Sequence, residues 1–300
     1  MKKKTYLIAL MAMALTLGSC SDNENGIGGE TSKYITVSTS IGNMTRVATD
    51  ANGGQTFEEG DEISVYAWTG APTVAPETSE RVVNNAINKL TNGSWVSTPQ
   101  MLWKNNRDKH YFIGVYPTAA ISDLSAGEYT FDVNKQTESD LLVAVNKDGL
   151  SYNADAQQTV PLTFTHVMAK LAVNLTYKNQ WGGIPTVEKV VVGNAAKEAT
   201  INYLTKVVTP SATAKEDFSL PEITENTKYV SVIIPQEDVK QLTIVIGGKN
   251  FVYDNGTPFK LESGKITTVN LEVGRDEIKL GDVKITNWED GSTFSGEALN

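Results

Sequence analysis

The chain has 300 residues, of which 40% are hydrophobic and 20% are charged, and its formal net charge at pH 7 is −9. An acidic chain with no basic stripe is not expected to bind nucleic acid or anionic lipid surfaces. A single cysteine excludes an internal disulfide, so buried cores must stabilise the one large domain or two ordinary domains that this length allows.

The N-terminus carries an export signal. Lysines at 2–4 precede an apolar run over residues 6–17, which is too short to cross a bilayer as a helix. Gly18 and Ser19 stand directly before Cys20, as a lipoprotein signal peptidase requires. We therefore expect residues 1–19 to be removed and Cys20 to become the acylated first residue. The alternative is an ordinary secretory signal with an unrelated cysteine.

Removal of residues 1–19 takes away three lysines and leaves 23 basic against 35 acidic residues, a net charge of −12. The acyl chains would tether the protein to a membrane with about 0.8 kcal/mol per buried CH₂ group. Residues 21–32 are polar and rich in glycine, which predicts a flexible tether. Asp22 and Glu24 resemble the tag that sends some lipoproteins to the outer leaflet of the outer membrane, although a simple solvated linker has the same composition.

The first predicted strand covers residues 34–41, where Ile35, Val37 and Ile41 alternate with polar residues and share one face with Thr39. The loop that follows is small and polar after Val47, and accessible loops of this kind are where proteases cut.

Abundant Thr, Val, Ile and Tyr together with 24 glycines favour an all-β chain of short strands. Asn92-Gly93, Gly247-Gly248 and Asn255-Gly256 predict tight turns. A polar, turn-rich stretch over 146–159 predicts a boundary between two domains, 47–158 and 159–300. Further strands are predicted at 63–68, 81–90, 94–96, 110–117, 129–133, 141–145, 162–177, 187–192, 200–204, 229–234, 242–246, 249–253, 259–261, 266–273 and 283–288. For residues 81–90 a short helix is the alternative to a strand.

No catalytic, cofactor or metal site is predicted. His110 and His166 have no second ligand at metal-binding spacing and are expected to be hydrogen-bonded strand residues. Acidic pairs such as Glu58-Glu59 fall at predicted turns, where solvated carboxylates are the ordinary outcome. The five tryptophans are expected to pack in cores, although exposed aromatics could form a glycan platform.

Several segments in this order resemble the fimbrillin family, the lipoprotein-precursor subunits of type V pili on anaerobic Gram-negative bacteria. They are Leu17–Cys20, Thr45-Arg46, Phe57–Tyr66, Tyr111–Pro117, Phe164–Leu171 and Ile285–Gly291. The resemblance implies two tandem transthyretin-like Greek-key β-sandwich domains. It also implies an outer-membrane lipid anchor, pilus subunits of the same or a related kind as partners, and an adhesion ligand on a host or bacterial surface.

The resemblance further implies that a trypsin-like protease cuts between Arg46 and Val47, which removes a lipidated leader of residues 20–46. Polymerisation would then proceed by strand exchange into the groove that the leader strand leaves. The exchanged residues would be Ile35, Val37 and Ile41 on the leader and Val283, Ile285 and Trp288 on a candidate donor. The sequence departs from the family pattern after Trp288, where no further strand is predicted.

Two other functions compete with a pilus subunit or adhesin. A monomeric surface lipoprotein that binds glycan would have the same export signal. A hydrolase is disfavoured because no nucleophile, base and orienting group can be assembled from the sequence.

Overall fold

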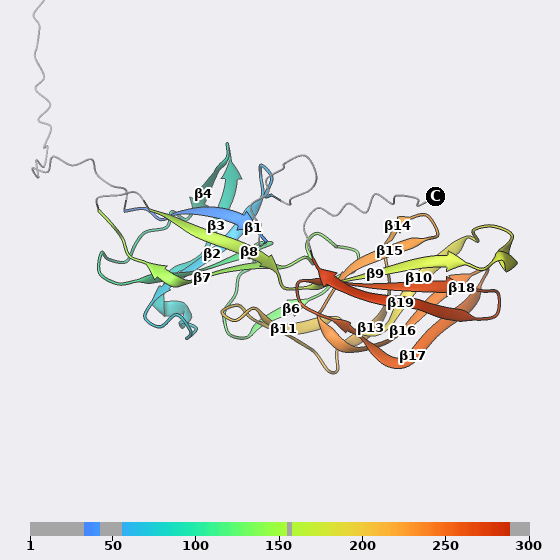
Figure 1. Ribbon diagram of the computed structural model, residues 1–300. Coiled ribbons are helices and arrows are strands. Elements are labelled where there is room, and N and C mark those ends of the chain that lie inside the picture. Colours follow the sequence, from blue (N-terminus) through green and yellow to red (C-terminus); the bar gives the residue numbers. More distant parts are fainter. Residues whose placement is uncertain (1–32, 43–55, 155–157, 289–300) are drawn as a thin grey trace, which may run out of the picture. The chain divides into compact units, whose positions relative to one another are not determined.

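The computed structural model describes residues 33–42, 56–154 and 158–288, and strands dominate that part of the chain (Figure 1). This confirms the all-β prediction. Helical structure within these ranges is limited to two short 3-10 segments, η1 (Thr78–Glu80) and η2 (Asn179–Trp181). None of the described helices is long and apolar enough to cross a membrane.

The first half of the chain forms a seven-stranded sheet in the order β1-β8-β7-β5-β2-β3-β4. Adjacent strands within this sheet pair antiparallel, except that β1 and β8 run parallel. The strands are β1 (Thr36–Ile41), β2 (Glu62–Thr69), β3 (Arg81–Thr91), β4 (Ser94–Thr98), β5 (His110–Tyr116), β7 (Leu142–Leu150) and β8 (Thr159–His166).

The β3–β4 hairpin confirms the turn predicted at Asn92-Gly93. Both residues have positive φ, 52° and 72°, as a two-residue hairpin turn with the twist of its strands requires. The turn brings Trp95 opposite Leu90. The residues Ile63–Trp68 of the central strand β2 are all buried, because an apolar core covers each face of this strand.

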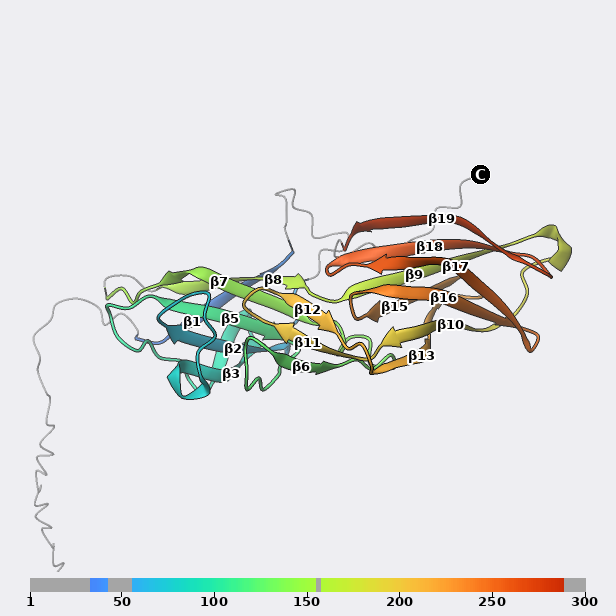
Figure 2. The same ribbon diagram turned by 90° about the horizontal axis from the view of Figure 1, so that it is seen from below.

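The second half contains a five-stranded and a four-stranded sheet. In the five-stranded sheet, ordered β14-β15-β9-β18-β19, the last three strands lie side by side (Figure 2). Its strands are β9 (Ala169–Tyr177), β14 (Glu222–Thr224), β15 (Lys228–Ile233), β18 (Lys265–Val273) and β19 (Ile278–Asn287). The four-stranded sheet, ordered β13-β10-β16-β17, contains β10 (Val187–Ala196), β13 (Lys215–Ser219), β16 (Gln236–Ile246) and β17 (Lys249–Leu261).

Two sequence predictions about strands were wrong. The single strand expected over 162–177 is two strands, because the chain leaves the ladder at Val167-Met168 and β9 joins another sheet. The turn expected at Asn255-Gly256 lies inside β17, where a register shift opposite β16 absorbs the extra residues as a bulge.

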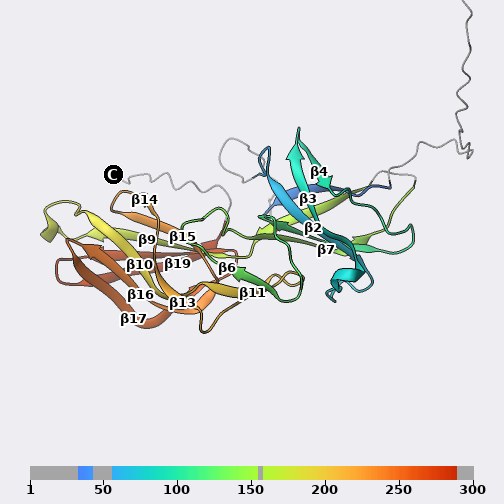
Figure 3. The ribbon, with the colours of Figure 1, turned by 180° about the vertical axis from the view of Figure 1, so that it is seen from behind.

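A three-stranded sheet joins the two halves of the sequence. Its order is β12-β11-β6, and β6 (Gly127–Thr130) pairs antiparallel with β11 (Glu198–Asn202), which pairs with β12 (Val207–Pro210) (Figure 3). The approach is close at Gly127, where a Cβ atom would lie 2.5 Å from the ring of Tyr203. The division at residues 158 and 159 stays a prediction. Residues on both sides of that division share sheets, since β8 pairs with β1 and β7.

The buried side chains form two clusters. One lies against a single face of the seven-stranded sheet and contains Ile35, Val37, Ile41, Ile63 and Phe164 among others. The other takes residues from the opposite face, such as Tyr66 and Trp68, and runs on through the sheets of the second half. The first cluster is the one to which β1 contributes.

Candidate assembly site at the first strand

The strand β1 lies at the edge of the seven-stranded sheet, beside β8 (Figure 1). Its register is continuous, with Val37 opposite Val160 and Ile41 opposite Phe164. On the outer face, hydroxyl groups support this pairing: Thr36 and Thr159 lie 3.3 Å apart, and Ser40 donates to Thr163 Oγ1 at 3.2 Å. The backbone pairing of β1 in the ladder is therefore with β8.

The inner face of β1 is apolar and well covered. Ile35, Val37 and Ile41 are 2%, 6% and 8% exposed. Their burial confirms the period-two pattern predicted from the sequence. Burying an aliphatic side chain contributes about 1.5 to 3 kcal/mol, so the three together contribute roughly 5 to 9 kcal/mol.

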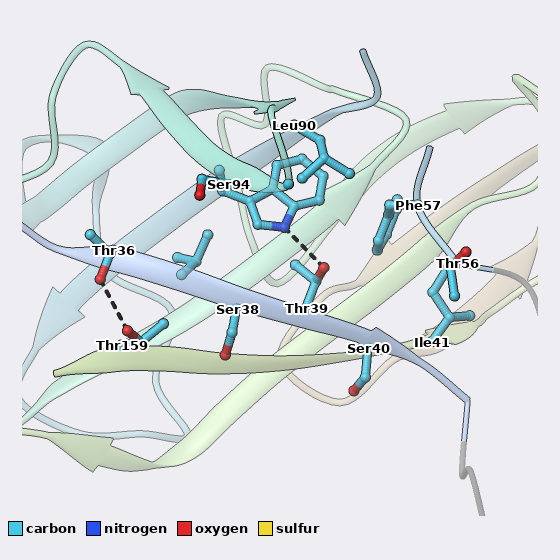
Figure 4. Close-up of a pocket in the computed structure, with 13 residues that line it drawn as sticks. Thr36, Ser38, Thr39, Ser40, Ile41, Thr56, Phe57, Leu90, Ser94 and Thr159 are labelled. Atoms are coloured by element: carbon cyan, nitrogen blue, oxygen red, sulfur yellow. Dashed lines mark hydrogen bonds between the residues drawn. The ribbon is translucent and has the colours of Figure 1, made fainter. Parts of the chain in front are cut away.

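The face of β1 that carries Val37, Thr39 and Ile41 is directed toward β4 across a groove of about 610 Å³. The indole Nε1–H of Trp95 crosses this groove and donates to Thr39 Oγ1 at 3.0 Å. In Figure 4, Thr39 points to this side of β1, whereas Ser38 and Ser40 point away from it. We call this space the β1 groove. Residues outside β1 that line it are Thr56, Phe57, Leu90, Gly93, Ser94, Trp95 and Thr159.

Each end of β1 is held differently. At the start, the Ile35 N–H donates to the Met101 carbonyl at 2.9 Å, and the Trp103 N–H donates to the Lys33 carbonyl at 3.2 Å. At the end, Ile41 lines the groove together with Phe57. The ring of Phe57 makes edge contacts with Trp95, Tyr116 and Phe164 at centroid distances of 5.3, 5.4 and 5.1 Å.

The acidic residues next to the groove stabilise the turn before β2 by accepting hydrogen bonds from backbone N–H groups. The Glu58 N–H donates to Asp61 Oδ2 at 2.7 Å, and the Asn92 N–H donates to Glu59 Oε1 at 2.7 Å. Glu62 forms an ion pair with Lys89 at 3.0 Å. Burial and the nearby Asp61 carboxylate raise the pKa of Tyr116, whose hydroxyl therefore stays protonated at neutral pH.

The predicted donor residues lie in the second half. Val283 and Ile285 belong to the edge strand β19 and are 41% and 38% exposed. Trp288 is buried: its ring stacks on His166 at 3.9 Å, and Lys170 Nζ lies 4.0 Å from its centroid. In this structure β19 pairs with β18. Cys20, Arg46 and Val47 lie outside the described residues.

Both histidines have structural partners. The ring of His110 is buried; its Nδ1–H donates to the Asp108 carbonyl at 3.1 Å, and its Nε2 accepts from the Lys104 N–H at 3.0 Å. Burial lowers the pKa of His110, although the hydrogen bond to Asp108 opposes this effect. His166 Nδ1 lies 2.7 Å from Asp140 Oδ1.

The described residues contain no group of three or more His, Cys, Asp or Glu side chains that could hold a metal ion. The tryptophans do not offer an open aromatic platform. Trp68, Trp103 and Trp288 are buried, while Trp95 and Trp181 are half-buried and donate their indole N–H to Thr39 and to the Val273 carbonyl.

Sequence reasoning missed the roles of Trp95 and Phe57 in the groove. The Asn92-Gly93 hairpin signal fixes where Trp95 falls on β4, but its contact with β1 spans 56 positions in the sequence. Nothing in a local pattern specifies such a contact.

The strand content, the sheet pairing and the buried edge strand define an all-β protein built from several sheets. The chain belongs to the fimbrillin-like family, whose model matches residues 45–288. Membership of this family supports a non-enzymatic role as a pilus subunit or adhesin at the cell surface, together with other pilus subunits. A comparison with curated proteins found no match.

Solved structures with the same fold come from Bacteroides species. A candidate cell adhesion protein from Bacteroides ovatus is 17% identical, with a TM-score of 0.64 over 85% of this chain and 98% of that chain. Another from Bacteroides uniformis is 18% identical, with a TM-score of 0.63 over 86% and 100%. A fimbrial protein from Bacteroides vulgatus is 13% identical, with a TM-score of 0.52 over 84% and 99%.

Proposed function

We propose that this protein is a structural or adhesive pilus subunit that is exported as a precursor acylated at Cys20. A trypsin-like protease cuts the precursor between Arg46 and Val47, and the leader, with β1, is lost. A strand from a neighbouring subunit then takes the place of β1. Val283, Ile285 and Trp288 belong to the segment that this chain offers to the next subunit, so that growth is head-to-tail.

The observation that supports this proposal most is the position of β1. It ends five residues before Arg46, lies at a sheet edge and pairs in the ladder with β8. A cut at Arg46 would separate it covalently from the rest of the fold. Its loss would expose the apolar contacts of three buried aliphatic side chains and an unpaired edge of β8, and such an edge templates strand addition.

The experiment compares the N-terminal residue of the assembled surface protein in the wild type and in Arg46→Ala. We expect Val47 in the wild type and an uncut, monomeric precursor in the variant. Arg107→Ala is the matched control, because Arg107 is exposed in a loop of the described chain, and this variant should assemble normally. Assembled material that keeps residues 34–41 would contradict the proposal.

The anchor is tested in the same strains. A palmitate analogue should label the wild type and Arg46→Ala, and it should not label Cys20→Ala, which loses membrane attachment. Equal labelling of Cys20→Ala would show that another residue is acylated.

A further inference from the structure

One side-chain hydrogen bond crosses the β1 groove, which both apolar and hydroxyl-bearing residues line. The Trp95 indole N–H is directed across the groove to Thr39 Oγ1, at the third of four alternating inward positions on β1. The other three positions hold Ile35, Val37 and Ile41, and these side chains are buried. An indole N–H has no acceptor capacity, so it requires an acceptor from whatever strand lies opposite.

We infer that the site of β1, between β8 and the β1 groove, selects its donor strand by sequence, and that Trp95 is the specificity-determining residue. The occupant is a strand with aliphatic side chains at the places of Ile35, Val37 and Ile41 and a hydrogen-bond acceptor, such as a hydroxyl or an amide, at the place of Thr39. This inference rests on the proposed function, because it concerns the strand that replaces β1.

The acceptor position discriminates because an apolar side chain there would leave the Trp95 N–H facing carbon atoms. The half-buried indole N–H would then lose its hydrogen bond without a protein acceptor to replace it, which costs free energy. At the fourth position, the groove meets Phe57, whose ring also contacts Phe164. A carboxylate next to these aromatic rings would be partly desolvated, which is unfavourable.

The C-terminal segment of this chain matches the pattern only in part. With Val283 and Ile285 at the first two positions, Asn287 supplies an amide acceptor at the third, but Glu289 falls on the fourth. A shift by two residues in one direction places Ile285 opposite the Trp95 N–H, where no acceptor remains, and a shift in the other direction places the polar Asn287 at the second, aliphatic position. The groove therefore accepts a strand from a different subunit in preference to the C-terminus of a second copy.

The test uses the lipid-free chain, residues 21–300, with Arg107→Lys and Arg275→Lys to remove the other exposed arginines. It is cut at Arg46 with an arginine-specific protease, so that the leader is held by noncovalent contacts alone. Fluorescent peptides of residues 33–42 compete for the groove, and their affinity is measured by anisotropy. We expect the Thr39→Val peptide to bind about tenfold more weakly than the wild-type peptide, equivalent to about 1.4 kcal/mol. The same comparison is made on Trp95→Phe and on the control Trp181→Phe, whose indole donates to the Val273 carbonyl in another sheet.

In Trp95→Phe the two peptides should bind within about twofold of each other, whereas Trp181→Phe should keep the tenfold difference. A peptide of residues 282–291 should bind more weakly than the leader peptide, and Glu289→Ile in that peptide should restore affinity. Equal binding of the Thr39→Val peptide to the wild type, or a preference that persists in Trp95→Phe, would overturn the inference.

If no peptide binds to the cut protein, the proposed strand exchange is contradicted. The contact between Trp95 and Thr39 is then tested separately in the uncut precursor. There, Thr39→Val and Trp95→Phe should lower the melting temperature less in combination than the sum of their separate effects. Additive shifts would show that the two side chains are not coupled and would also overturn the inference.

Discussion

At the scale of single residues, the described part of the chain uses its polar groups to hold loops in place. His110 is an example, since both ring nitrogens have backbone partners within the loop that precedes β5. That loop also contains Trp103, whose N–H holds Lys33 beside β1. The protonation state of one buried histidine is thus linked to the segment that holds the start of the leader strand.

The first prediction concerns pH. Burial holds the pKa of His110 below its ordinary value of 6.5 in the folded protein. The unfolded chain therefore binds a proton more readily at mildly acidic pH, so the stabilisation is complete above pH 6.5 and is lost as the pH falls below it. We expect the midpoint of urea unfolding to decrease between pH 7 and 5. His110→Gln, which can keep both hydrogen bonds, should flatten this dependence, and parallel curves for the two proteins would contradict the assignment.

At the scale of elements, β1 has well-buried side chains and, as an edge strand, forms a hydrogen-bonded ladder on one side. Its main-chain ladder is with β8, and Trp95 provides the side-chain contact from β4. A strand of this kind is stable while its inner face is filled, and its removal would leave an unpaired edge on β8. The apolar face therefore decides how tightly β1 is held.

The second prediction tests that face. Ile35→Ala removes buried carbon atoms from the start of the strand and should lower the free energy of unfolding by about 2 to 5 kcal/mol. Ser38→Ala is the matched control on the exposed face and should stay within about 0.5 kcal/mol of the wild type. Both are measured by chemical denaturation of the uncut precursor. Equal changes in the free energy of unfolding for the two variants would show that burial of the inner face of β1 does not stabilise the protein.

At the scale of the whole molecule, sheets and cores cross the middle of the sequence. The strand β6 belongs to the first half and pairs with β11 of the second, and one apolar cluster contains residues from both halves. Shared cores make separate unfolding of the halves unfavourable, because either half would expose the surface that the other covers. We expect residues 33–288 to unfold as one cooperative unit.

The third prediction follows from the close approach at Gly127. Gly127→Ala places a methyl group against the Tyr203 ring and should destabilise the protein by about 1 to 3 kcal/mol. Tryptophan fluorescence and hydrogen exchange should report one transition for both halves, shifted together in the variant. Glu128→Gln, on the exposed neighbour, is the control. Two separate transitions would instead support independent domains divided near residue 158.

Features that depend on neighbouring residues could be predicted from the sequence. The all-β class, the buried face of Ile35, Val37 and Ile41, and the Asn92-Gly93 hairpin follow from period-two alternation and from turn chemistry, which act over a few positions. The motif at Cys20 is local in the same sense. They predict one side of the candidate site, namely the strand β1 that lines the groove.

Only the tertiary structure decided the partners of those elements. The pairing of β1 with β8, the hydrogen bond from Trp95 to Thr39 and the sheet that joins β6 to β11 connect residues far apart in the chain. An alternating strand carries the same pattern whichever neighbour it joins, and the break at Val167-Met168 lies within a continuous apolar run. Long-range packing of the two cores selects one pairing, because only that pairing buries both faces of the central strands.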